Sequence, residues 1–261
     1  MPKLGLGLSL PQTRIAGGFT PKKLSGLSLW LKADAGVTLS GPNVTAWADQ
    51  SGNSRNFTKS IANTGFPTFS SGAVLFTRID KYDDPNASIL ALPSSSLNLT
   101  GPYTLIAVFR GIESTVFSKS NNSDKRRKYQ IATNSSTVYT FESINSEDNS
   151  ISYDTEVTDP NTKRLVIAQY LSDTSGVLYY NGTQVATGDG NGPGGAFGYG
   201  LDETNNASIF IGAAAFAEGS GYNAEASDDM YVYEIIFYNR AITTPERQQV
   251  EEYLNAKYDI Y

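Results

Sequence analysis

One run of nine residues limits the choice of fold more than any other part of the sequence. Residues 230–238, MYVYEIIFY, are aromatic or aliphatic except for Glu234. Strict alternation in a strand divides the apolar side chains between two faces, Met230, Val232, Ile236 and Tyr238 on one and Tyr231, Tyr233, Ile235 and Phe237 on the other. A strand that is apolar on both faces is typical of the centre of a sheet covered from both sides.

The hydrophobic period changes after this run. Thr243 and Glu246 fit a capping box, in which the glutamate reaches back to the N-cap amide, and Pro245 is tolerated in the first turn. Apolar and aromatic residues then recur at helical spacing, at Val250, Tyr253, Leu254 and Tyr258. The pattern predicts a short amphipathic helix that packs on the rest of the molecule through one stripe.

The chain between residue 27 and this run predicts many short strands. Apolar and β-branched runs bounded by Gly, Pro, Asn and Ser lie at 27–33, 44–48, 73–77, 87–92, 103–110, 114–118, 128–133, 137–143, 151–157, 163–171, 176–181, 183–188 and 207–214, with the last strand at 229–238. The pair Asn181-Gly182 suits a type I′ turn, in which both central residues need positive φ. Many strands with one terminal helix predict an all-β antiparallel sandwich.

Composition excludes several classes of protein. The 261 residues contain no Cys and no His, which removes disulfides, Ser-His-Asp and Cys-His catalysis, and ordinary zinc sites. A net charge of -6 and a pI near 4.8 argue against nucleic-acid partners and anionic membranes. No apolar run is long enough to insert into a membrane, and the first residues are too short and glycine-rich for a secretory signal.

Two motifs near the ends of the chain carry a family resemblance. YEIIFYNRAI, followed by the T-x-x-E-R pattern that begins at Thr243, resembles the end of a concanavalin A-like lectin/glucanase domain, the LamG-like jelly roll. LSLWLKADAGVT and VTAWADQSGNSRNFT, which begin at Leu27 and Val44, resemble the opening strand and turn of that domain. GVLYYNGTQVATG, at 176–188, resembles a late hairpin of the family. The resemblance implies one jelly-roll domain over residues 27–261.

Residues 1–26 are predicted to form an extended N-terminal arm and linker. Leucines alternate with Gly or Ser and would share one side of an extended segment, at Leu4, Leu6, Leu8 and Leu10. Three interpretations stay open: an unstructured leader, a strand of the domain's own sheet, or an arm that adds a strand to a neighbouring subunit. LGLGLSLP also resembles the openings of tailed-bacteriophage virion proteins, which implies anchoring to other virion proteins or a homo-oligomer.

The sequence offers no catalytic constellation. Laminarinase-like members of the family carry an E-x-D-x-x-E strand whose two carboxylates cleave the glycosidic bond. This chain lacks it; the nearest acids are Asp154, Glu156 and Asp159, which are commonplace on exposed sheet faces. Glu234 is expected to be a buried carboxylate satisfied by hydrogen bonds. We therefore expect a protein that is not an enzyme.

Binding residues are expected in loops. Trp30 and Trp47 lie in core-type patterns and are expected to pack inside the protein. Tyr199, Tyr222 and Asp202 lie in loops rich in Gly or Asn and are candidates for glycan contact. The densest basic cluster, formed by Lys125, Arg126, Arg127 and Lys128, is either a docking patch for an acidic partner or a solvated hairpin tip.

Calcium is the one cofactor considered. Asp49 and Asn53, together with the acidic and amide residues of 202–206, offer the oxygen ligands that calcium prefers. The alternative is that Asp49 and Asn53 hydrogen-bond their own turn around Ser51-Gly52.

These observations lead to three functional hypotheses. The first is a non-enzymatic bacteriophage virion protein, a capsid decoration, head fibre or tail protein, that displays a lectin-like domain toward cell-surface glycans. The second is a bacterial secreted or surface carbohydrate-binding module, and the third is a glycoside hydrolase. The glycan in the first hypothesis comes from fold analogy. A virion location is expected under that hypothesis.

Overall fold

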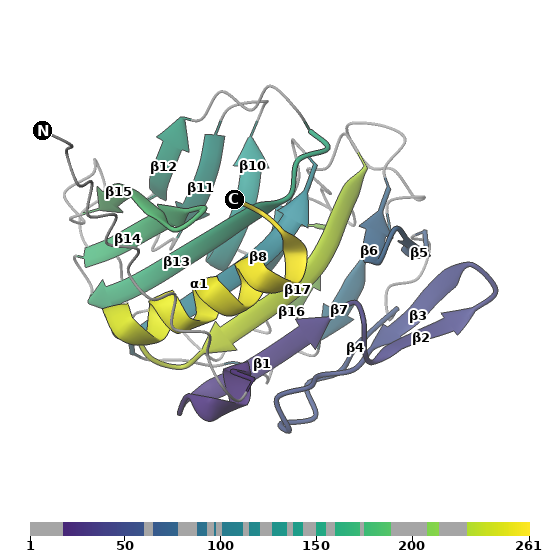
Figure 1. Cartoon of the computed structure of the whole chain (residues 1–261). Helices are drawn as coiled ribbons and strands as arrows, with labels where there is room; N and C mark the ends of the chain where they lie inside the picture. Colours follow the sequence, from purple (N-terminus) through teal and green to yellow (C-terminus); the bar gives the residue numbers. More distant parts are fainter. Residues whose placement is uncertain are drawn as a thin grey trace, which may run out of the picture.

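The computed structural model describes residues 18–59, 65–77, 88–92, 97, 101–111, 115–120, 127–134, 138–142, 150–154, 160–172, 175–188, 208–213 and 229–261. In this part of the chain, strands in two layers form an antiparallel β-sandwich with one C-terminal helix, α1 (Thr244–Tyr258) (Figure 1). The predicted all-β jelly-roll class is confirmed.

The first layer carries the helix on its outer face. Its strands are hydrogen-bonded in the order β1 (Leu27–Lys32), β17 (Met230–Tyr238), β8 (Tyr103–Arg110), β13 (Arg164–Ser172), β14 (Ser175–Tyr180) and β15 (Thr183–Gly188). β6 (Ala73–Phe76) pairs with the first residues of β17. α1 crosses this layer over β17, β8 and β13 (Figure 1).

The second layer lies behind the first. Its strands are paired in the order β4 (Phe57–Thr58), β7 (Leu90–Leu92), β16 (Ser208–Ile211), β9 (Thr115–Ser120), β10 (Arg127–Asn134), β11 (Val138–Glu142) and β12 (Ser150–Asp154). β3 (Asn43–Trp47) pairs with β2 (Val37–Ser40), β4 and β5 (Thr68–Ser70), and β5 pairs with β6. These short strands join the two layers along one side.

Two apolar cores hold the layers together. Between the sheets, side chains such as Leu31, Phe109 and Phe237 are completely buried. On the other face of the first layer, Trp30, Ile106 and Leu165 pack under α1 through Val250, Leu254 and Tyr258. β17 is therefore covered on both sides, as its sequence predicts, and the helix docks through the predicted stripe.

The predicted division of β17 into two faces is wrong in its second half. A register shift between Val232 and Glu234 against β8 marks a β-bulge. Met230 and Val232 contribute to the core between the sheets, but so do Ile235 and Phe237, while Tyr233, Ile236 and Tyr238 lie on the helix side. Strict alternation would have placed Glu234 in the apolar core between the sheets. The bulge instead turns it toward polar groups of α1.

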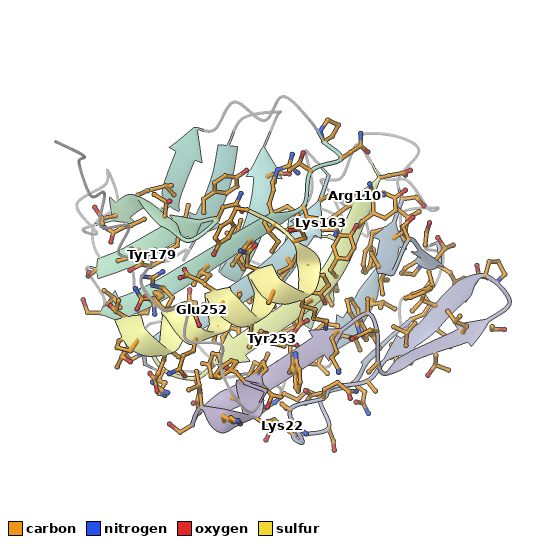
Figure 2. All side chains as sticks on the ribbon, in the orientation of Figure 1. Lys22, Arg110, Lys163, Tyr179, Glu252 and Tyr253 are labelled. Carbon is orange, nitrogen blue, oxygen red and sulfur yellow. The ribbon has the colours of Figure 1, made fainter. Side chains whose placement is uncertain are left out.

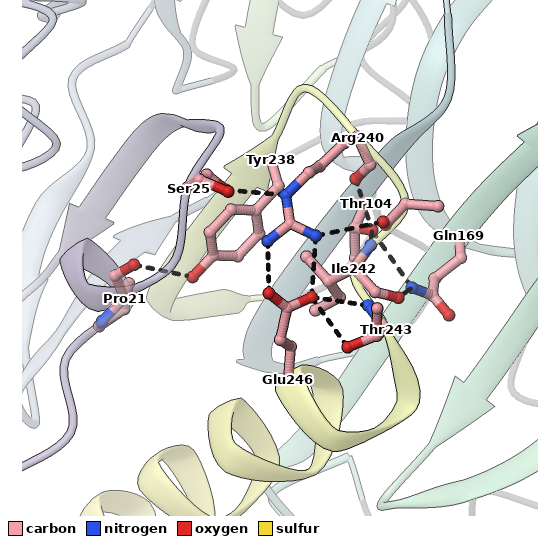
Figure 3. A network of polar contacts seen from close by, with 10 residues as sticks. Pro21, Ser25, Thr104, Gln169, Tyr238, Arg240, Ile242, Thr243 and Glu246 are labelled. Atoms are coloured by element: carbon pink, nitrogen blue, oxygen red, sulfur yellow. Dashed lines mark hydrogen bonds and ion pairs between the residues drawn. The ribbon is translucent and has the colours of Figure 1, made fainter.

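The start of α1 is fixed as its capping pattern predicts. The Thr243 amide donates to Oε2 of Glu246 (2.8 Å), and the Arg240 guanidinium forms a bidentate pair with the same carboxylate (2.8 and 2.7 Å). The Thr104 hydroxyl donates to the Arg240 carbonyl and accepts from the Ile242 amide (Figure 3). This network ties the end of β17, the helix start and β8 together.

Each sequence range predicted as a strand overlaps one in the structure, with ends that differ by a few residues. The turn between β14 and β15 has φ of 47° at Asn181 and 77° at Gly182, as a type I′ turn requires. β2, β4 and β5 were not predicted. They have two to four residues each, at a corner where pairing with neighbours decides the conformation.

The packed body begins before residue 27. Phe19 is buried on the helix side against Tyr253, and the Tyr238 hydroxyl donates to the carbonyl of Pro21, the first residue of the short 3-10 helix η1 (Pro21–Lys23). No helix in the described ranges has the length and apolar character needed to cross a membrane.

Candidate functional site

The loop that holds Asp49 covers the outer edge of β1. Oδ1 of Asp49 accepts hydrogen bonds from the amides of Trp30 (3.0 Å) and Ser51 (2.8 Å). Its Oδ2 accepts from the Ser51 hydroxyl and the Arg55 amide. The backbone amide of the next residue, Gln50, donates a hydrogen bond to the Trp30 carbonyl (2.7 Å). Side chains and loop amides thus take the hydrogen bonds that a further strand would otherwise provide.

Asn53 and Trp47 continue this cover. Asn53 Nδ2 donates to the carbonyls of Leu27 (3.0 Å) and Ser28 (3.2 Å), and the Trp47 indole donates to the Lys32 carbonyl. The W-x-D-x-SGN motif therefore closes a sheet edge. Both oxygens of Asp49 are occupied by the turn and the strand, as the alternative to a calcium site requires. The calcium site itself stays a prediction, and no group of three acidic, Cys or His residues gathers within the described ranges.

A second polar cluster lies under α1, around the buried Glu234. Its side chain has no solvent exposure. Oε1 accepts from the Trp30 indole (2.6 Å) and the Tyr253 hydroxyl (3.0 Å). Oε2 accepts from the Tyr258 hydroxyl (2.7 Å) and the Lys257 ammonium (2.8 Å). Burial, and next the Glu234 charge, raise the pKa of Tyr258 and Tyr253, so both hydroxyls stay protonated and donate.

This cluster binds the helix to the sheet. Four donors occupy both oxygens of Glu234, so the carboxylate has no free position for a ligand or a substrate proton. Lys257 also reaches Asp34 at 3.2 Å, which leaves this partly exposed ammonium paired on two sides. The prediction that Glu234 is a buried, hydrogen-bonded carboxylate is confirmed, and so is the expected burial of Trp30 and Trp47.

Tyr231, Arg110 and Lys163 form a row of side chains on the outer face of the first layer. Unlike the clusters around Asp49 and Glu234, this row contains two cations and no carboxylate. Tyr231 in β17 is paired with Arg110 in β8, and the β8–β13 register, extended by one residue, places Lys163 opposite Arg110. The Arg110 guanidinium lies 3.8 Å from the centre of the Tyr231 ring. Lys163 donates to the Tyr258 carbonyl at 2.8 Å. All three side chains are partly exposed, and Arg110 and Lys163 lie on the side of the molecule where α1 ends (Figure 2).

The sequence did not single out this row. Arg110 ends one strand and Lys163 precedes another, some fifty positions further along, so each resembles an ordinary charged strand end. Only the antiparallel register of β8 and β13 brings them together. No signal in a single sequence specifies that register.

Most of the predicted binding residues lie outside the described ranges. This holds for the glycan candidates Tyr199, Tyr222 and Asp202, the arm residues Leu4, Leu6, Leu8 and Leu10, the acids Glu156 and Asp159, and the basic residues Lys125 and Arg126. The backbones of Arg127 and Lys128 begin β10, and Asp154 ends β12. All of these remain predictions.

Solved structures share this architecture. The binding domain of botulinum neurotoxin DC, in complex with rat synaptotagmin II, has a TM-score of 0.58 at 13% identity, covering 88% of this chain and 52% of that one. The same binding domain in complex with SialylT gives 0.56 at 13% identity, covering 88% and 51%. Trypanosoma rangeli sialidase in complex with sialic acid gives 0.56 at 13% identity, covering 90% and 34%.

These likenesses establish the fold as a jelly-roll β-sandwich. The chain spans about half the length of the toxin binding domains and about a third of the sialidase. No protein-family model and no curated protein matches the sequence.

Proposed function

We propose that this protein is a non-enzymatic glycan-binding module of a bacteriophage virion. The observation that carries the glycan part is the lectin-like sandwich, which matches a toxin binding domain in complex with SialylT over 88% of this chain. Botulinum neurotoxin type C, another protein of similar structure, depends on interaction with two ganglioside molecules for its cell entry. Surface glycans are thus the ligand class that the neighbours favour.

The occupied carboxylates support a binding role over a hydrolytic one. A glycosidase of this type needs two acids flanking the scissile bond, with room for substrate between them. Glu234 is enclosed by four donors, and Asp49 is held in its own turn. In this chain the motif around Asp49 covers the edge of β1, and the motif around Glu234 bonds α1 to the sheet. Neither Glu234 nor Asp49 is placed as one of a catalytic pair.

The virion part of the proposal depends on the leucine-glycine segment at residues 4–10. Alternating leucines suit a strand added to the sheet of another protein, and such an arm would hold the sandwich on a particle while its loops face outward. Under this proposal the partners are other virion proteins or further copies of the chain.

Glycan binding is tested directly with the full-length protein. We expect immobilised protein to retain one or more members of a panel of sialylated, uronic-acid and neutral oligosaccharides, without release of reducing sugar on prolonged incubation. Reducing-sugar release that Asp154→Asn or Glu156→Gln abolishes would favour a hydrolase. Failure to bind any glycan in the panel would remove the lectin part of the proposal.

A further inference from the structure

Arg110 and Lys163 form an unusual pair for this protein. The molecule carries a net charge of -6, yet Arg110, the last residue of β8, and Lys163, the residue before β13, are opposite each other when the β8–β13 register is extended by one residue. Like charges in directly opposed positions of an antiparallel pair are destabilising. The ion pairs of the described residues join other groups, Lys32 and Lys257 to Asp34, Lys257 to Glu234, Arg240 to Glu246 and Arg247 to Glu251. None neutralises Arg110 or Lys163.

Among the residues that the structure describes, aromatic rings and a carbonyl, and no carboxylate, hold both cations in place. Arg110 stacks on the Tyr231 ring, and its Nε is buried with no hydrogen-bond partner in the described structure. Lys163 is fixed by the Tyr258 carbonyl and lies 5.4 Å from the centre of the Tyr233 ring. Stacking orients a guanidinium while leaving its outer N–H groups free to bind an anion.

Two tyrosines lie beside the cations: Tyr231 is partly exposed, and Tyr233 is buried, with 5% of its surface exposed. Burial raises the pKa of Tyr233, and the nearby positive charge of Arg110 partly offsets this rise. The Tyr233 hydroxyl is therefore protonated at neutral pH and lies within the field of the guanidinium. Tyr231 lies beside it on the same strand face. The row of Arg110, Lys163 and Tyr231 therefore offers a fork of N–H donors, an ammonium and one phenol hydroxyl, and the buried Tyr233 ring supports Lys163.

We infer that Arg110, Lys163 and Tyr231 form a binding site for the carboxylate of an acidic sugar. A carboxylate matches the planar fork of arginine and would neutralise the opposed cations. The Tyr231 hydroxyl would bind a hydroxyl group of the sugar. This inference rests on the proposed glycan-binding function and adds to it a location and a ligand class.

The test compares matched ligands and matched variants. Binding of 3′-sialyllactose, a glucuronic-acid-terminated disaccharide, lactose and inorganic phosphate is measured by titration calorimetry on the full-length protein. The variants are Arg110→Gln, Lys163→Gln and the control Lys22→Gln. Lys22 is exposed and lies in η1, away from the row (Figure 2). Circular dichroism establishes that each variant is folded.

The site predicts binding of at least one acidic sugar over lactose, with affinity reduced about tenfold or more by Arg110→Gln and by Lys163→Gln and unchanged by Lys22→Gln. Equal affinity for lactose, or acidic-sugar binding that both row variants retain, would overturn the site while leaving glycan binding intact. Phosphate binding as tight as that of the sugars would overturn the assignment to a sugar and leave only an anion site. No binding to any sugar would refute the proposed function together with the site.

Discussion

Glu234 of β17 is the residue that contacts both β1 and α1 through its carboxylate. A buried ionised carboxylate is costly unless donors compensate for its lost hydration. Here the donors come from two elements: the Trp30 indole in β1, and two tyrosine hydroxyls and the Lys257 ammonium in α1. The β-bulge between Val232 and Glu234 is what presents the carboxylate to them. A single acidic residue of β17 thus links α1 to β1.

Replacement of Glu234 by glutamine should be strongly destabilising. The amide nitrogen of glutamine cannot accept, so two of the four donors lose their acceptor and Lys257 loses its buried partner. We expect a loss of about 3 kcal/mol or more in unfolding free energy, measured by urea denaturation. Glu252→Gln, an exposed position on the same helix, is the control and should change little. A Glu234→Gln protein as stable as this control would contradict the role given to the cluster.

At the scale of elements, the start of α1 depends on the Glu246 carboxylate, which both caps the helix and pairs with Arg240. Glu246 accepts from the Thr243 amide and pairs with Arg240, whose backbone is in turn held by Thr104 of β8 (Figure 3). The Arg240 hydrogen bond is the largest effect that lowers the pKa of Glu246, to about 2, with the Thr243 hydrogen bonds adding to it. The cap and the strand–helix junction share one acid.

This shared acid predicts a loss of stability in acid. The pKa of Glu246 is lower in the folded state than its usual value of about 4.3, so the folded state binds fewer protons. The stabilisation is present above about pH 4.3 and is lost as the pH falls toward about 2. Melting temperature measured across this range should fall less steeply in Glu246→Gln than in the wild type. The effect will be modest because the side chain is 26% exposed. An identical pH dependence in both proteins would exclude this contribution.

Features that depend on neighbouring residues could be predicted from the sequence. Features that depend on the pairing of distant strands could not. The capping box at Thr243 and Glu246 and the turn at Asn181-Gly182 depend on a few adjacent residues, so the sequence specifies them. The bulge in β17 depends on its register with β8, which alternation alone does not reveal. For the same reason the opposition of Arg110 and Lys163 was not predicted.

For the whole molecule, the two motifs that resemble the family cover one edge and one face of the first layer. The loop around Asp49 and Asn53 covers the edge of the first layer at β1. The Arg240–Glu246 network fixes the helix on its outer face. A covered edge does not recruit another strand. Addition of a strand from a partner would therefore have to use some other edge than β1.

Deletion of residues 1–17 separates the sandwich from its proposed assembly role. The cut retains Phe19 and Pro21, which pack on Tyr253 and Tyr238, so the shortened protein should keep the melting temperature of the full chain. If the leucine-glycine segment is the anchor, the shortened protein will fail to enter phage particles, as measured by immunoblotting of purified virions after complementation. Leu6→Asp with Leu8→Asp in the full-length chain is a second variant, because it keeps the length and removes the apolar side. Incorporation of both variants at the wild-type level would exclude the arm as the anchor, and a lower melting temperature after deletion would indicate that the segment belongs to the sandwich.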